Sequence, residues 1–244
     1  MDEVKDNSNY VCYEVDASYY IEQNRHIEVM ENVLFYENGT LNKIFKGPVT
    51  INLEGYRKKG KSVDYHEYKA YYINNNVISK NRVTDDLSIK VYDFLYKILI
   101  QMHIKYTYKN KIINYESLVS LLSPKKNIIT NEYINKITKP ILVYSIKRNI
   151  LSVVKDKKIS LLDSPKYLSE IKEKICIEVN NKIQSFGMQV ELILESVDFV
   201  DDTNTSELNS ILFKQKEMKA LNYTYQEENL IDYLEFVNIE KEDH

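Results

Sequence analysis

The feature that most constrains this fold is a change of hydrophobic period at Gly187, within residues 163–199. Before the glycine, apolar residues recur every three or four positions, which predicts a helix with one apolar stripe. The stripe consists of Leu168, Ile171, Ile175, Val179, Ile183 and Phe186. After it, Val190, Leu192 and Leu194 alternate with polar residues, which predicts a half-buried strand. Because Gly187 suits a left-handed helix end, we expect a helix–glycine–strand unit that buries two apolar surfaces.

The chain before this unit is rich in predicted strands. Asn38-Gly39 lies between two alternating segments, 33–37 and 40–45, and this dipeptide is typical of a type I′ hairpin turn. Further strands are predicted at residues 10–15, 27–29, 49–53, 68–74, 87–93 and 96–108.

Helices are predicted in the second half of the chain. A short one over 118–122 has Asn114 or Ser117 as its cap, and a longer one covers about 131–154. Pro140 lies inside the longer helix, so we expect a kink or a helix start at that point. Ser164-Pro165 is a typical helix entry, with a capping hydroxyl followed by a proline in the first turn. A last amphipathic helix is formed by Leu208, Ile211, Leu212, Gln215 and Met218, which are candidate assembly residues.

Composition and charge exclude several classes of protein. Hydrophobic residues make up 43% of the 244 residues and charged residues 28%, which argues against disorder and against a fibre. The net charge of −3 gives no global field that favours nucleic acid, and no nucleic-acid partner is expected. Between residues 46 and 172 basic residues exceed acidic ones by about two to one, whereas the segment 223–244 is acidic. The basic region is either solvated surface or a face for anionic lipid or for the acidic end of a neighbouring chain.

The strongest local charge is a run of four cations, Arg57, Lys58, Lys59 and Lys61. Such runs are most often solvated loops. Contact with anionic lipid or with a protein partner is the functional interpretation, and a nucleic-acid patch is the least favoured one.

Cellular location is constrained by the cysteines and by hydropathy. Cys12 and Cys176 are far apart and unlike a disulfide framework, which indicates a reducing compartment. The first ten residues are polar and unlike a signal peptide, and no stretch approaches the length of a membrane span. We therefore expect a cytoplasmic protein, with any membrane contact being peripheral on the cytoplasmic face.

Catalytic and metal-binding groupings are not apparent in the sequence. The histidines, His26, His66, His103 and His244, lack a second ligand at metal-binding spacing. Asp85-Asp86 and Asp201-Asp202 lie beside turns, where aspartate is favoured for local hydrogen bonding. We expect no enzyme activity, no cofactor and no metal.

Two parts of the chain resemble the SPFH or Band 7 family, which includes stomatin, prohibitin, flotillin and HflK/C. The order KICIEVNNKIQSFGMQVELILESVDF is similar to the end of that domain. Residues 29–35, the Asn38-Gly39 turn and residues 45–48 resemble the opening of a bacterial branch labelled "virion core protein-like". Asn32 replaces the glutamine of that branch, Gly47-Pro48 reverses its Pro-Gly order, and His103 replaces a mid-strand glycine.

The resemblance implies an α+β, SPFH-like fold. An antiparallel curved sheet would come first, then helices packed on sheet, a final strand and a short C-terminal helix. The expected organisation is a frayed N-terminus (1–8), a β-rich first subdomain (9–113), a helix–helix–strand second subdomain (114–200), a short amphipathic helix (201–222) and an acidic tail (223–244).

The resemblance also implies a role. SPFH proteins are scaffolds that oligomerise on or near membranes and organise membrane proteins, in some cases during envelope stress. We therefore expect a protein-binding homo-oligomer that associates peripherally with an anionic membrane surface or a membrane-protein partner. The alternative is a soluble structural or assembly protein of a larger particle, without a lipid role.

Overall fold

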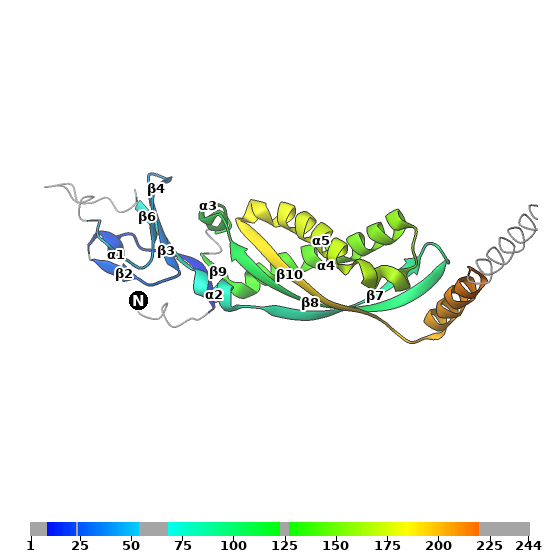
Figure 1. Ribbon diagram of the computed structural model, residues 1–244. Helices are drawn as coiled ribbons and strands as arrows, with labels where there is room; N and C mark the ends of the chain where they lie inside the picture. The colour runs from blue at the N-terminus through cyan, green and yellow to red at the C-terminus, as the bar shows by residue number, and fades with distance from the viewer. Residues whose placement is uncertain (1–8, 23, 54–67, 123–126, 220–244) are drawn as a thin grey trace, which may run out of the picture.

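Two antiparallel sheets lie one after the other along the length of the molecule, as Figure 1 shows. The computed structural model describes residues 9–22, 24–53, 68–122 and 127–219. Strands dominate the first part and two long helices cover one face of the second sheet, so the fold is α+β.

The first sheet has the strand order β4-β3-β6-β1-β9. Its strands are β1 (Tyr10–Val15), β3 (Glu31–Glu37), β4 (Thr40–Lys46), β6 (Tyr68–Asn74) and β9 (Ile128–Thr130). Asn38 and Gly39 have positive φ angles of 50° and 76°, which confirms the turn predicted between β3 and β4. Beside this sheet, β2 (Arg25–Ile27) pairs with β5 (Val49–Ile51), so the strand predicted at 27–29 ends before Val29.

The second sheet has the order β10-β8-β7 and joins distant parts of the chain. Its strands are β7 (Val83–Asp93), β8 (Ile98–Ile112) and β10 (Met188–Phe199). Even-numbered residues of β8 from Ile100 to Asn110 are buried, which confirms the long half-buried strand expected from the alternation. β7 begins four residues earlier than predicted, at Val83, because its first residues pair with β8.

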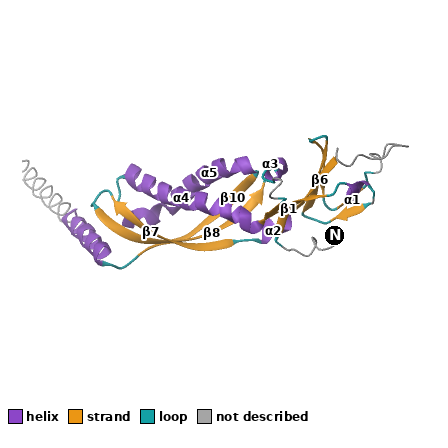
Figure 2. Cartoon of the chain, turned by 180° about the vertical axis from the view of Figure 1, so that it is seen from behind, coloured by secondary structure: helices purple, strands orange, loops and turns teal. Residues whose placement is uncertain are grey.

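Helices α4 (Asn131–Lys157) and α5 (Leu168–Ile183) cover the inner face of this sheet (Figures 1 and 2). α4 runs through Pro140, so the helix start considered at that residue is wrong. The helix begins at Asn131 because the Thr130 side chain accepts a hydrogen bond from the Tyr133 N–H. Ser164-Pro165 lies in a preceding 3₁₀ helix, η4 (Leu161–Tyr167), whose capping hydroxyl is that of Ser160 rather than Ser164.

The described residues contain further helical elements. They are α1 (Ser18–Ile21), α2 (Asn75–Lys80), α3 (Tyr115–Val119), η5 (Gln184–Phe186) and a helix over residues 203–219. Of these, α1 and α2 were not predicted. Asn114 caps α3 by accepting a hydrogen bond from the Ser117 N–H, which confirms one of the two expected caps.

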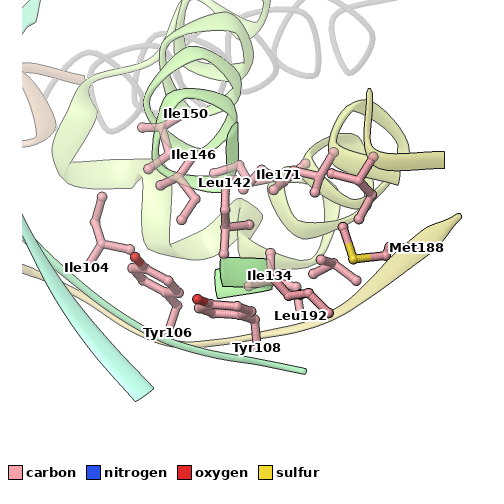
Figure 3. Close-up of a cluster of buried hydrophobic side chains, with 14 of the residues drawn as sticks. Ile104, Tyr106, Tyr108, Ile134, Leu142, Ile146, Ile150, Ile171, Met188 and Leu192 are labelled. Carbon is pink, nitrogen blue, oxygen red and sulfur yellow. The ribbon is translucent and has the colours of Figure 1, made fainter. Parts of the chain in front are cut away.

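The helix–glycine–strand unit has the predicted form. Ile171, Ile175, Val179 and Ile183 are fully buried against the sheet, and Leu168 and Phe186 are partly buried on the same core. Gly187 has a φ of 73°, and Val190 follows it with 3% of its surface exposed. The two apolar surfaces of the unit therefore meet in one core, part of which Figure 3 shows.

The main apolar core reaches from the helices to the first sheet. It includes Cys12, Leu34 and Ile73 of the first sheet together with residues of β7, β8, β10, α4 and α5. A second cluster, which includes Val33 and Phe35, lies on the opposite face of the first sheet. Where the two sheets meet, the Tyr115 hydroxyl accepts hydrogen bonds from the side-chain amides of Asn32 and Asn75. The two parts of the chain therefore share both an apolar core and a polar joint.

Candidate functional site

The predicted assembly helix is anchored to the end of the second sheet. Asp202 Oδ1 accepts a hydrogen bond from the Thr205 N–H at 2.8 Å, which caps the helix over residues 203–219. The Asn204 side chain donates to the Leu99 carbonyl at 2.9 Å, and Leu208 is fully buried in the main core. The first turns of this helix therefore pack against the second sheet and the main core.

The structure divides the candidate assembly residues between two environments. Leu208 is buried, Ile211 and Leu212 are half-buried, and Gln215 accepts a hydrogen bond from the Tyr96 hydroxyl at 2.8 Å. Met218, by contrast, is 57% exposed, and Phe213 is 62% exposed. Residues 213–219 are all exposed, so this part of the helix projects from the end of the molecule (Figure 1).

The neighbouring β7–β8 connection is also apolar and exposed. Tyr92, Phe94, Leu95 and Leu99 are each between 44% and 54% exposed. Tyr92 and Leu99 face each other across the strand pair, and the Tyr92 and Phe94 rings are in edge contact at 6.0 Å. Two further exposed apolar residues lie on the helix over residues 203–219, at the same end of the molecule (Figure 1). We call the exposed apolar side chains of this end the distal apolar surface. Its members are Tyr92, Phe94, Leu95, Leu99, Phe213 and Met218.

A buried carboxylate holds the β7–β8 connection in place. Asp93 is fully buried, and its Oδ1 accepts hydrogen bonds from the Leu95 and Tyr96 N–H groups. Its Oδ2 accepts from the Ser160 hydroxyl at 2.9 Å and from the Leu161 N–H at 2.8 Å. One side chain therefore fixes the connection that presents Phe94 and Leu95 and ties it to η4.

A second surface lies on α4, along the side that faces away from the sheet. Lys136, Pro140, Tyr144, Lys147, Leu151 and Lys155 recur at steps of three and four, so they form one stripe, which we call the α4 outer face. All six are exposed or half-exposed, and Tyr144 is 57% exposed. No acidic residue occurs from Tyr133 to Lys155, whereas five basic residues do.

The predicted basic loop cannot be compared with these surfaces, because Arg57, Lys58, Lys59 and Lys61 lie outside the described residues. The sequence analysis also missed both the distal apolar surface and the α4 outer face. Phe94-Leu95 directly after Asp93 was a usable signal, since large apolar residues in a turn are exposed. The acid-free run in α4 was a second signal.

The pKa values of Asp85 and Cys12 are shifted by their surroundings. Burial tends to raise the pKa of the Asp85 carboxyl, but the Lys139 ammonium at 2.6 Å and the Tyr106 hydroxyl at 2.9 Å outweigh burial and lower it. Burial raises the pKa of the Cys12 thiol to about 12, so this thiol is neutral at physiological pH. His103 Nδ1 lies 3.7 Å from Asp86, and the described residues contain no group of three side chains able to hold a metal ion.

Comparison with known proteins adds no assignment. No family model matches the chain, and no curated protein matches it. Within the described ranges, no helix is both long and apolar enough to cross a membrane.

Proposed function

We propose that this protein is a non-catalytic scaffold of the SPFH type, which self-associates and contacts a membrane or a membrane protein peripherally. The resemblance of the sequence supports the family assignment, and the exposed surfaces support an interaction role. The acidic tail and the basic loop lie outside the described residues, so the proposal depends on neither.

The distal apolar surface is the observation that carries the self-association. Six of the twelve large hydrophobic side chains that are exposed in the described residues belong to it. Gathered apolar residues of this kind mark protein or membrane contacts, whereas isolated ones are ordinary surface. Burial of Phe213 and Met218 between copies would also support the projecting turns of a helix that is otherwise marginal in water.

The first test measures self-association. Light scattering after size-exclusion chromatography should show an oligomer for the full chain. The variant Phe213→Ser/Met218→Ser should shift the mass towards the monomer, because it removes apolar area from the contact. The free energy of unfolding of this variant, measured with urea, should differ from that of the wild-type monomer by less than about 0.5 kcal/mol, since both side chains are exposed. The control Ile113→Ser, which replaces another exposed apolar residue, should leave the mass unchanged.

The second test measures lipid contact by pelleting the full chain with vesicles. Binding that rises with anionic lipid content and falls with salt would support the peripheral membrane role. An oligomer that binds no vesicles of any composition would instead favour the alternative, an assembly protein without a lipid role. A monomer without lipid affinity would contradict both scaffold functions.

A further inference from the structure

The part of α4 that carries the α4 outer face has an excess of positive charge. The whole chain has a net charge of −3, yet the stretch from Tyr133 to Lys155 contains five cations and no anion. Lys139 pairs with Asp85, and Arg148 pairs with Glu178. No described residue forms an ion pair with Lys136, Lys147 or Lys155. These three lysines therefore keep their charge available to a partner.

The outer face of the second sheet is a built-in comparison, because it has basic residues whose charge is balanced locally. Lys105 of β8 lies 3.5 Å from Glu195 of β10, and Lys109 stands opposite Glu191 in the strand register. Across the β7–β8 pair, His103 lies 3.7 Å from Asp86. Carboxylates thus lie beside Lys105 and Lys109, whereas Lys111 stands opposite Gln189 and three of the five basic residues of α4 have no ion-pair partner in the described residues.

Apolar groups are interleaved with the free lysines on the same face. Pro140 and Tyr144 lie between Lys136 and Lys147 on this stripe, and Leu151 lies between Lys147 and Lys155. The Lys182 ammonium of α5 lies 4.6 Å from the centre of the Tyr144 ring, and Ile177 of α5 is 57% exposed. Basic residues beside partly exposed aromatic and aliphatic groups are the composition of helices that lie in a membrane interface.

We propose that the α4 outer face is the surface that contacts anionic lipid, an inference that rests on the peripheral membrane role proposed above. α4 spans 27 residues, or about 40 Å, and runs along the long axis of the molecule (Figure 2). Contact through this face therefore places the long axis parallel to the membrane. The lysines meet lipid phosphates while Tyr144 enters the headgroup region.

The experiment compares two charge reversals of equal size on opposite faces of the full-length protein. Lys136→Glu/Lys147→Glu changes the α4 outer face, and Lys109→Glu/Lys111→Glu changes the outer face of the sheet. Binding to phosphatidylcholine vesicles with and without phosphatidylserine is measured by pelleting, and folding of each variant is checked by urea titration. We expect the α4 variant to lose about 30-fold or more in affinity for the phosphatidylserine vesicles, and the control less than about threefold.

A third variant, Tyr144→Ser, separates the apolar contribution from charge. It should weaken binding to anionic vesicles at high salt as well as at low salt, because burial of an apolar ring is not screened. Equal binding of wild type and Tyr144→Ser at high salt would contradict insertion of the ring.

Several outcomes would contradict lipid contact by the α4 outer face and would leave the proposed scaffold function standing. If wild type binds vesicles but the control variant loses more affinity than the α4 variant, the lipid surface lies elsewhere. If the α4 variant changes the oligomer mass in the absence of vesicles, a second copy occupies this face. If wild type binds an oligonucleotide more tightly than it binds anionic vesicles, and the α4 variant loses that binding, nucleic acid is the preferred partner. Failure of wild type to bind any vesicle would contradict the membrane role itself.

Discussion

Buried polar side chains in this molecule link elements that are far apart in the chain. Asp93 joins the β7–β8 connection to η4 through four hydrogen bonds. Asn110, inside the main core, donates to Asn135 Oδ1 and accepts from the Thr138 hydroxyl. Because a buried donor without a partner costs more than a hydrogen bond contributes, such residues tolerate substitution poorly.

Replacing Asp93 with alanine should lower the free energy of unfolding by roughly 3 kcal/mol, because it leaves buried N–H groups without an acceptor. Equilibrium urea titration measures this change. Asp198→Ala is the control, since that carboxylate is exposed on the outer face of the sheet, and it should change stability by less than about 0.5 kcal/mol. Similar losses in the two variants would contradict the structural role of Asp93.

Asp85 should make stability depend on pH. Its pKa is lowered in the folded protein, so the ionised form is favoured by folding, and the stabilisation is present above the ordinary carboxyl pKa. It is lost as the pH falls below about 4 and through the lowered folded pKa. Asp85→Asn should therefore be less stable than wild type near neutral pH, and the difference should shrink towards about pH 3. Urea titrations across this range test the expectation, and a difference that stays constant would contradict it.

At the scale of elements, local patterns predicted the structure where one face of a segment meets one core. The α5–Gly187–β10 unit and the β3–β4 hairpin follow from period and turn chemistry alone. The start of β7 and the cap of η4 did not follow, because they depend on partners distant in sequence. Ser160, for example, is held by Asp93, and no pattern near Ser164 reports that contact.

Gly187 is required by the tight packing of this unit against α3. A Cβ at this position would lie 2.1 Å from the Asn114 carbonyl oxygen and 2.9 Å from the Leu118 nitrogen. Gly187→Ala should therefore destabilise the fold by about 3 kcal/mol or more, from strain at positive φ together with a backbone clash. Gly39→Ala is the matched control: its φ is also positive, but nothing lies within 4 Å of the added Cβ, so it should cost only about 1 kcal/mol. Urea titration of both variants separates clash from strain, and equal losses would contradict the close approach.

At the scale of the whole molecule, the sequence predicted the α+β class but not the surfaces. In the distal apolar surface, the strand register brings Leu99 beside Tyr92, and the helix over residues 203–219 lies beside Leu99. Neither relation is visible in sequence order. The α4 outer face was accessible in principle, since its residues are local.

The end-to-end arrangement of the two sheets predicts an extended particle. A compact chain of this length would have a radius of gyration of about 18 Å. Small-angle X-ray scattering of the monomeric Phe213→Ser/Met218→Ser variant should give a clearly larger value, and a value near the compact one would contradict the arrangement in Figure 1.

Strand β3 has apolar surroundings on both of its sides. Leu34 belongs to the main core, while its neighbours Val33 and Phe35 belong to the second cluster. A disturbance that loosens either cluster therefore shifts this strand and, through it, the opposite cluster. The two clusters should consequently unfold in a single thermal transition. The slowest-exchanging amides should be those of β3.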